Sequence, residues 1–307
     1  IKEVIDKYCS FMPVEIYYTN ADAPKEDPKD ATVDVDAKEV DEKTNAAESS
    51  TDNKTTDAEA SADDTKDKKD GEKPEAPKPL NTTTPLWAKH PNDCTDEEYK
   101  EFYRKVFHDY KEPLFWIHLN MDYPFNLKGI LYFPKINTQY DNLEGTIKLY
   151  NNQVFIADNI KEVIPEFLML LKGVIDCPDL PLNVSRSFLQ NDGYVKKLSA
   201  YITRKVADKL TGLFNTERDN YQKYWDDIHP FVKYGCMRDA KFFEQVKDTL
   251  LFKTTKGEYL TLAEYLSKNE GKVGKKVIYT NDPTRQAASV ALYDNEGVDV
   301  VVMDSLI

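Results

Sequence analysis

One arginine, Arg186, stands in a setting that suits phosphate chemistry. It follows a loop stiffened by Pro178 and Pro181, and Ser185 can cap the short helix expected beside it. A helix N-terminus with a guanidinium fork is a good anion site, and such an arginine can stabilise the charge on a transferring phosphate. On composition alone, a surface ion pair is the more common role for an arginine in this position.

A self-contained nucleotide site or hydrolase is not supported by the remaining motifs. The sequence has no GxxxxGK[ST] loop, no GxGxxG after a strand, no HExxH and no GxSxG. Its histidines and cysteines share no metal-ligand spacing: His90, His108, His118, His229, Cys9, Cys94, Cys177 and Cys236. We therefore expect no metal site, and the scattered cysteines indicate reduced thiols in a cytoplasmic compartment.

The overall charge argues against nucleic acid and membrane as partners. The net charge of −13 repels phosphate backbones and anionic membrane surfaces. No apolar run approaches the roughly 20 residues needed to cross a bilayer. The basic side chains spaced along the expected long helix are interpreted as a solvated face: Lys196, Lys197, Arg204, Lys205 and Lys209.

A polar insert separates the start of the chain from the rest. Residues 20–79 contain Val33, Val35 and Val40 as their only branched aliphatic residues and no aromatic residue. Such a segment cannot bury enough apolar area to offset about 1–2 kcal/mol of backbone entropy per residue. We predict a disordered acidic linker, which is either a mobile tether or a tolerated insertion.

Order is expected again from Leu80 onwards. Capping boxes at Thr95–Glu98 and Thr261–Glu264 predict two helix starts. Strands are expected over 115–119, 127–133, 146–150 and 153–157, a helix from Pro165 to Leu171, and a long amphipathic helix over 195–213. Strands over 277–280 and 298–303 flank a helix opened by Asp282-Pro283, which implies a parallel, right-handed crossover.

Four stretches resemble the Hsp90 family in the same order. The run GVIDCPDLPLNVSRSFLQ (173–190) closely resembles the catalytic-loop signature of that family. PLWAKHPNDCTDEEYKEFYRKVFHDY, from Pro85, resembles the opening of its middle domain, and IKLYNNQVFIADN, from Ile147, its central strand region. IKEVIDKYCSFMPVEIYY, from Ile1, resembles the end of its nucleotide-binding domain. The resemblance leaves out the insert, is weakest after Asn215, and is closer to bacterial members.

The resemblance implies a fold class and a domain organisation. Residues 1–19 would end an N-terminal nucleotide-binding domain and residues 20–79 form a charged linker. An α/β domain with three α/β/α layers, similar to ribosomal protein S5 domain 2, would span 80–213. A helical connector over 214–250 and a second small α/β domain over 251–307 would follow. We expect the ATP-binding domain before Ile1 and a C-terminal dimerisation domain after Ile307.

The resemblance also implies a mechanism and partners. In this family ATP, with Mg²⁺, is held by the N-terminal domain, and the middle domain supplies an arginine to the γ-phosphate when the dimer closes. By motif position that arginine is Arg186, and Gln190 accompanies it. Unfolded clients, the N-terminal ATPase domain and a second copy of the chain would be the partners, and this segment alone would not hydrolyse ATP. Trp87 stands where the family has an exposed tryptophan tied to client and domain contacts; the alternative is that it packs the start of the domain.

The sequence departs from the family pattern in two places, and two alternative functions remain. One departure is the long acidic insert, which is unlike the compact linker of the best-known bacterial members. Asn152 and Gln153 replace basic residues that many relatives carry, so no phosphate or interdomain role is expected there. One alternative is a transducer domain of a gyrase or mismatch-repair ATPase, but the sequence lacks the glutamine-threonine-lysine loop and the basic surface of those proteins. The other is an interaction scaffold without ATP coupling, in which Arg186 is structural.

Overall fold

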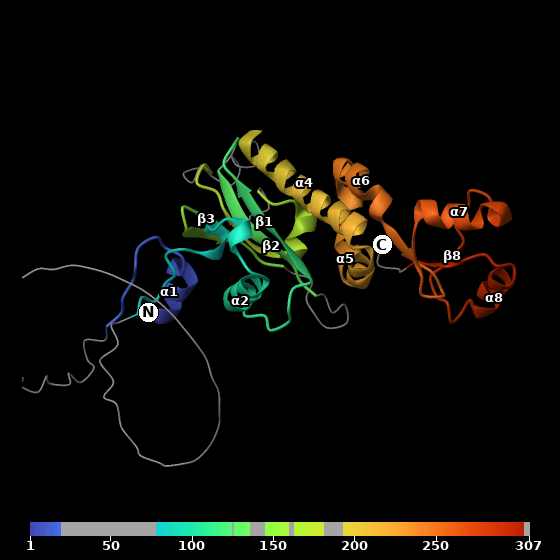
Figure 1. The fold of residues 1–307 in the computed structure, drawn as a ribbon, viewed down its shortest axis with the longest axis horizontal. Helices are drawn as coiled ribbons and strands as arrows, with labels where there is room; N and C mark the ends of the chain where they lie inside the picture. Colours follow the sequence, from blue (N-terminus) through green and yellow to red (C-terminus); the bar gives the residue numbers. More distant parts are fainter. Residues whose placement is uncertain (20–77, 125, 136–144, 160–162, 181–192, 304–307) are drawn as a thin grey trace, which may run out of the picture. The chain divides into compact units, whose positions relative to one another are not determined.

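The computed structural model describes residues 1–19, 78–124, 126–135, 145–159, 163–180 and 193–303. Residues 1–16 and 80–307 form one compact unit, and residues 17–79 form a second. The helices and strands described below belong to the first unit (Figure 1). Within the described ranges, no helix is both long enough and apolar enough to span a membrane.

A five-stranded mixed sheet forms the framework, with strand order β1-β2-β5-β3-β4. Its strands are β1 (Phe115–Met121), β2 (Leu127–Phe133), β3 (Ile147–Asn151), β4 (Val154–Asp158) and β5 (Lys172–Asp176). Strands β3 and β5 are parallel, whereas the other neighbours are antiparallel. The carboxyl ends of β3 and β5 therefore meet at one end of the sheet, where Tyr150 pairs with Asp176.

Both faces of the sheet are buried, which explains the near-continuous apolar character of its inner strands. Along β2, Leu131 faces one core cluster, whereas Ile130 and Tyr132 face the other. The first cluster is covered by the long helices, and the second by the helices that precede β1, so that α2 and α4 flank the sheet (Figure 1). The bounds are α1 (Lys2–Cys9), η1 (Leu86–Ala88), η2 (Pro91–Asp93), α2 (Asp96–Phe107), η3 (Glu166–Leu170), α4 (Gly193–Thr216), α5 (Arg218–Arg238), α6 (Ala240–Val246) and η4 (Lys247–Thr249).

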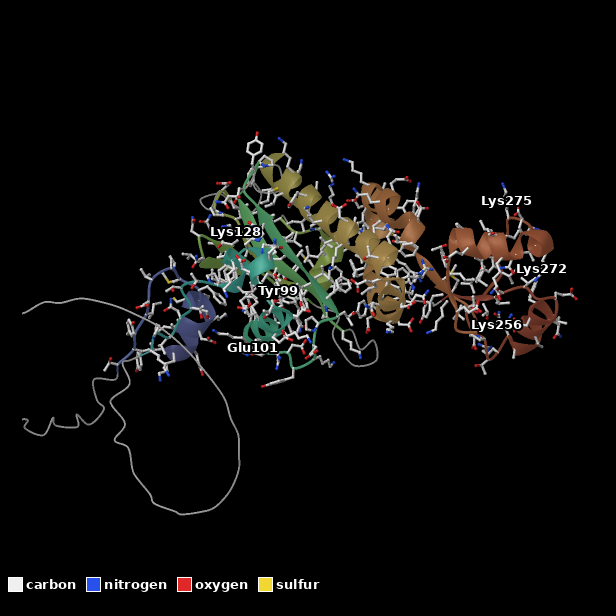
Figure 2. The ribbon with its side chains drawn as sticks, in the orientation of Figure 1. Tyr99, Glu101, Lys128, Lys256, Lys272 and Lys275 are labelled. Carbon is white, nitrogen blue, oxygen red and sulfur yellow. The ribbon has the colours of Figure 1, made fainter. Side chains whose placement is uncertain are left out.

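Local sequence signals explain how several of these elements begin. Thr95 accepts from the Glu98 N–H while Glu98 accepts from the Thr95 N–H, so the predicted capping box of α2 is confirmed. Tyr99 of α2, which Figure 2 labels, stacks on Trp116 of β1 with ring centroids 4.9 Å apart. The strands predicted over 115–119 and 127–133 are confirmed as β1 and β2.

The stretch around Pro165 differs from the prediction. A short 3-10 helix, η3, replaces the helix expected to run to Leu171, and the chain then enters β5, which the sequence analysis did not predict. A Cβ atom at Gly173 would lie 2.8 Å from the Ile130 carbonyl oxygen, so glycine lets β5 approach β2 closely. Position 173 therefore requires glycine, in the centre of the sheet.

The long helices pack into the same core as the sheet. Helix α4 extends through Thr216, and α5 and α6 contribute Trp225, Phe231 and Phe242 to the cluster that holds Leu131. Gly235 of α5 lies against the rings of Phe167 and Phe242, where a Cβ atom would come within 2.7 Å and 2.9 Å of ring carbons. Helices α5 and α6 lie within 214–250, where a helical connector was expected.

The last part of the chain is a small α/β arrangement. It contains β6 (Leu251–Lys253), β7 (Tyr259–Thr261), α7 (Leu262–Val273), β8 (Tyr279–Thr280), α8 (Ala287–Asn295) and β9 (Val301–Val302). The capping box at Thr261 is confirmed, and β8 and β9 are parallel with α8 between them, as the predicted crossover requires. Helix α8 begins at Ala287 rather than at Asp282, whose carboxylate instead accepts from the N–H groups of Thr284 and Arg285 in the preceding turn.

Candidate functional site

The segment predicted to carry the catalytic residues lies outside the described part of the structure, which stops before this segment and resumes after it. Arg186 and Gln190 lie in residues 181–192, outside the described residues. The two ends of that segment are described: Leu180, which follows β5, and Gly193, which opens α4. The described part of the candidate site is the stretch that leads into this segment. We call it the root and define it as residues 176–180 together with the side chains that hold them.

A buried carboxylate lies at the start of this root. Asp176, the last residue of β5, is 6% exposed. Its Oδ2 accepts from Trp87 Nε1 at 3.2 Å and from the Gln153 backbone N–H at 2.9 Å. Burial raises the pKa of Asp176, and the hydrogen bonds from Trp87 and Gln153 oppose that shift only in part. Within the described residues its Oδ1 has no hydrogen-bond partner.

Trp87 is packed in the core rather than displayed on the surface of this structure. Its side chain is 1% exposed, and its indole lies 4.6 Å from the Phe11 ring and 5.1 Å from the Tyr150 ring, measured between centroids. A buried indole N–H needs an acceptor, and Asp176 supplies it. This position matches the packing alternative, while a client contact by Trp87 stays a prediction.

A tight hairpin between β3 and β4 organises the other side of the root. Asn152 (φ 49°) and Gln153 (φ 66°) form a two-residue turn with both backbones in the left-handed region, as turns that fit the twist of a hairpin require. This conformation directs the Gln153 N–H at Asp176. The Gln153 side chain, with its amide nitrogen toward the chain start, lies 2.8 Å from the Phe11 carbonyl and 2.9 Å from the Thr83 carbonyl.

Asn81 ties the first residues of the chain to the residues that follow the insert. Asn81 Nδ2 donates to the carbonyls of Met12 (2.9 Å) and Val14 (2.7 Å), and its Oδ1 accepts from the Ile16 N–H at 2.7 Å. The Leu80 N–H donates to the Ile16 carbonyl at 2.8 Å. We call these bonds the Asn81 clasp. They join residues on either side of the insert, so the chain departs and returns at one place.

Residues 177–180 are tied down by several groups at once. Asn151 Nδ2 lies 2.9 Å from the Pro178 carbonyl, and the Asn126 N–H donates to Asp179 Oδ2 at 2.9 Å. Cys177 Sγ lies 3.3 Å from the Tyr194 hydroxyl, which connects the root to the first turn of α4. Burial raises the pKa of the Cys177 thiol, so it stays protonated and acts as a small apolar side chain.

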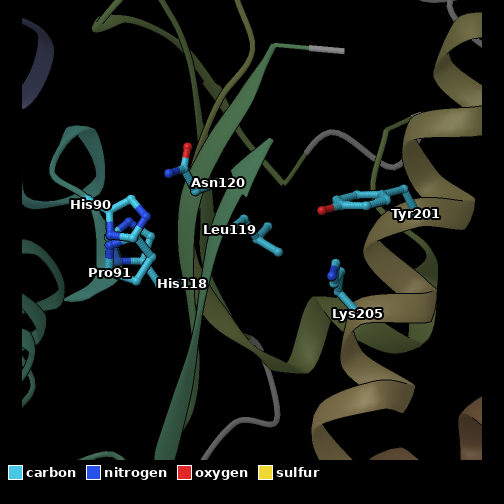
Figure 3. Close-up of a pocket in the computed structure, with 7 residues that line it drawn as sticks. All are labelled: His90, Pro91, His118, Leu119, Asn120, Tyr201 and Lys205. Atoms are coloured by element: carbon cyan, nitrogen blue, oxygen red, sulfur yellow. The ribbon is translucent and has the colours of Figure 1, made fainter. Parts of the chain in front are cut away.

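A separate concave surface lies at the free edge of β1. It encloses about 190 Å³ between β1, the η2 region and α4 (Figure 3). Its lining residues are His90, Pro91, His118, Leu119, Asn120, Tyr201 and Lys205. Burial lowers the pKa of His118, and although its hydrogen bond to the Trp87 carbonyl works the other way, nearby His90 lowers it further. His118 is therefore neutral at pH 7, which argues against an anion site built on the two histidines.

The arrangement can hold the start of the segment that contains Arg186. Sequence reasoning identified Trp87 but missed Asp176, Asn151, Gln153 and Asn81, which hold the root and the chain start. The Asn-Asn-Gln run between two strand patterns was the one available signal for the hairpin. No interdomain role was expected for Gln153, yet its side chain holds Phe11 of the chain start.

Comparisons with known proteins agree on one family. A sequence model described as Hsp90 protein matches residues 1–306. The chain is 47% identical over 230 residues to chaperone protein HtpG of Porphyromonas gingivalis, covering 73% of this chain and 34% of that protein. It is 38% identical over 309 residues to chaperone protein HtpG of Bacteroides thetaiotaomicron, covering 99% of this chain and 39% of that protein. The chain thus spans little more than a third of the length of these relatives.

A solved structure supports the fold. The middle domain of a heat shock protein from Plasmodium falciparum matches 72% of this chain and 90% of its own, with a TM-score of 0.57 and 23% sequence identity. At that identity the likeness concerns the fold alone, and the fold is that of a middle domain. On the family match over nearly the whole chain and the identity to the bacterial relatives, this chain belongs to the Hsp90 family.

Proposed function

We propose that this chain is the middle segment of an ATP-dependent chaperone of the HtpG type. The segment binds unfolded or partly folded client proteins and completes an ATPase whose nucleotide is held elsewhere in the protein. Family membership and the middle-domain fold support this proposal. The protein would work as a homodimer joined by a C-terminal domain, in the cytoplasm.

The proposed organisation follows the expected boundaries. Residues 1–19 end a nucleotide-binding domain and 20–79 form a charged linker. A three-layer α/β/α domain of the ribosomal protein S5 domain 2 type spans 80–213, a helical connector 214–250, and a small α/β domain 251–307. The two core clusters on opposite faces of the sheet support the layered arrangement.

Arg186 is proposed to contact the γ-phosphate of ATP, with Mg²⁺, held by the N-terminal domain, and Gln190 to assist it. The observation that carries this role is the root itself. Asp176, Cys177, Asp179 and Leu180 are all held by buried or backbone-directed contacts, so the segment with Arg186 starts from a fixed point. A guanidinium that arrives only on domain closure makes hydrolysis conditional on that closure.

The test replaces Arg186 by alanine in the full-length protein and measures ATP turnover and ATP affinity separately. We expect turnover to fall by about 10²-fold or more, since arginines of this type contribute orders of magnitude to the rate. ATP affinity should stay unchanged because the nucleotide pocket lies in another domain. Gln190→Ala should show a smaller loss, and Lys197→Ala, on the exposed face of α4, serves as the control that keeps turnover.

Two outcomes would redirect the interpretation. Unchanged turnover in Arg186→Ala would favour an interaction scaffold in which this arginine is structural. A salt-sensitive complex of the protein with DNA would favour a transducer domain of the gyrase or mismatch-repair type.

A further inference from the structure

One side-chain amide gathers the backbone carbonyls that lead into residues 181–192. Asn151, the last residue of β3, is 9% exposed. Its Nδ2 lies 2.9 Å from the Pro178 carbonyl oxygen, 3.3 Å from that of Cys177 and 3.4 Å from that of Leu180. Carbonyl groups repel one another, so their convergence on one point requires a donor there, and an amide nitrogen supplies two N–H groups.

The orientation of this amide is itself fixed. Asn152 Nδ2 donates to Asn151 Oδ1 at 3.0 Å, so the nitrogen of Asn151 is the atom left to face the carbonyls. Asn152 in turn belongs to the tight hairpin and has φ 49°. The turn thus presents Asn151 in one orientation toward the root.

The other contacts of the root do not replace Asn151. The Cys177 N–H bonds to the Tyr150 carbonyl at 3.0 Å, the Leu180 N–H bonds to the Cys177 carbonyl at 3.2 Å, and Asp179 is bonded through its side chain to Asn126. These contacts fix where Cys177 and Asp179 lie. The direction in which the chain leaves β5 depends on the carbonyls of Pro178 and Leu180, and Asn151 is their donor.

We propose that Asn151 is a positioning residue for Arg186. Its amide sets the course of residues 177–180 and hence the place from which the segment with Arg186 begins, without touching the nucleotide. The inference rests on the proposed function, because it concerns the same ATPase step. A displacement of about 1 Å at a reacting centre can cost on the order of 100-fold in rate, so a modest loss of support is enough to matter.

The experiment uses Asn151→Leu in the full-length protein, since leucine has nearly the same shape but donates no hydrogen bond. We expect kcat for ATP hydrolysis to fall by about 10- to 100-fold with KM for ATP unchanged. Asn151→Ser, which keeps one short donor in a smaller side chain, should retain more of the activity. If the leucine variant folds poorly, kcat of the serine variant still tests the role of Asn151.

Asn159 offers a matched control in the same sheet. At the far end of the β3–β4 hairpin its amide donates to the Gly145 carbonyl at 3.1 Å and accepts from the Ile147 N–H at 2.7 Å. Asn159→Leu removes the same kind of amide–backbone bonds away from the root. Because Asn159 has φ 49°, leucine also adds backbone strain there, so this variant should lower the thermal midpoint at least as much as Asn151→Leu, yet keep kcat within about twofold of the wild type.

A double variant separates the possible failures. If Asn151 acts through Arg186, adding Asn151→Leu to Arg186→Ala should lower kcat no further. Normal kcat in Asn151→Leu beside a defective Arg186→Ala would overturn this inference and leave the proposed function standing. A further loss in the double variant would overturn it too, whereas normal turnover in Arg186→Ala would remove the proposed function itself.

Discussion

Trp87 and Asp176, 89 positions apart in the sequence, share a buried hydrogen bond in which the indole Nε1 donates to the carboxylate Oδ2 at 3.2 Å. The bond joins η1 to the last residue of β5, the central strand of the five-stranded sheet. Phe11, which is 4% exposed, lies on the other side of the same indole. One tryptophan therefore contacts both the chain start and the root of the segment with Arg186.

Removing the indole should destabilise the domain strongly. Trp87→Ala opens a cavity and should lower the free energy of unfolding by about 3–5 kcal/mol. Trp87→Phe keeps most of the ring packing but leaves the Asp176 carboxylate with one donor fewer, which should cost about 1–3 kcal/mol. Urea denaturation measures both. Trp116→Phe is the control, because that indole is only partly buried, and an equal loss there would show that the bond to Asp176 contributes nothing.

The pH dependence of stability should reveal the buried carboxyl of Asp176. Burial raises its pKa in the folded protein, so between the unfolded and folded values the native state binds the proton more tightly than the unfolded state. Its contribution to the free energy of unfolding is therefore greatest at low pH and is lost as the pH rises through the folded pKa. Asp176→Asn keeps the shape and removes this titration.

We accordingly expect the stability of the wild type relative to Asp176→Asn to decrease as the pH rises above the ordinary aspartate pKa of about 3.9, and to level off above the folded pKa. Denaturant midpoints at several pH values, converted with a common slope, measure this difference. A difference that stays constant, or grows with pH, would contradict the raised pKa.

The Asn81 clasp should control how firmly the chain start is held. Asn81→Ala removes the donor to Met12 and Val14 and the acceptor of the Ile16 N–H, which should cost about 1–3 kcal/mol because these backbone groups are partly buried. Hydrogen exchange should then accelerate at the amides of Ile16 and Leu80. Asn120→Ala, at an exposed position of β1, should leave those rates unchanged. Unaltered exchange in Asn81→Ala would mean that the clasp does not hold the segment.

The sequence predicted the elements whose signals are local and missed those whose reasons lie elsewhere in the fold. Capping boxes and strand patterns act within a few residues, so α2, α7, β1 and β2 were found. Strand β5 was missed because Gly173 and the prolines after it are typical of loops. Glycine is needed at this position because the backbone of β2 lies too close to leave room for a Cβ atom. No spacing rule pairs Trp87 with Asp176, since only the order of the strands brings them together.

The candidate site shows the same division. The resemblance identified Arg186, Gln190 and Trp87, since short motifs carry them. Asn151 was not singled out, and Gln153 was noted only as a replacement for a basic residue of the family, because their partners are backbone atoms distant in the sequence. When a side chain bonds a backbone carbonyl, the partner can be any residue type, so the sequence carries no signal for the pair.

A second buried carboxylate, Asp299, should depend on pH in the opposite sense to Asp176. It is 2% exposed and lies 2.9 Å from Lys268 Nζ and 3.3 Å from Lys256 Nζ (Figure 2 labels Lys256). Burial raises its pKa, but the ammonium groups of Lys268 and Lys256 outweigh that effect and hold the pKa below its ordinary value. Its contribution to stability is thus present above the unfolded pKa of about 3.9 and is lost as the pH falls through the folded value.

Asp299→Asn should therefore destabilise the small α/β part at pH 7 and make little difference at pH 2–3. We expect a loss of about 1–3 kcal/mol at pH 7, below that of a fully buried pair because both lysines are partly exposed and regain water. Hydrogen exchange at the Val301 amide, which bonds to the Ile278 carbonyl, reports on this part of the chain. Lys275→Met, at an exposed position (Figure 2), is the control for removing a positive charge near α7. An effect of Asp299→Asn that is as large at pH 3 as at pH 7 would show that packing, and not the two lysines, gives this carboxylate its role.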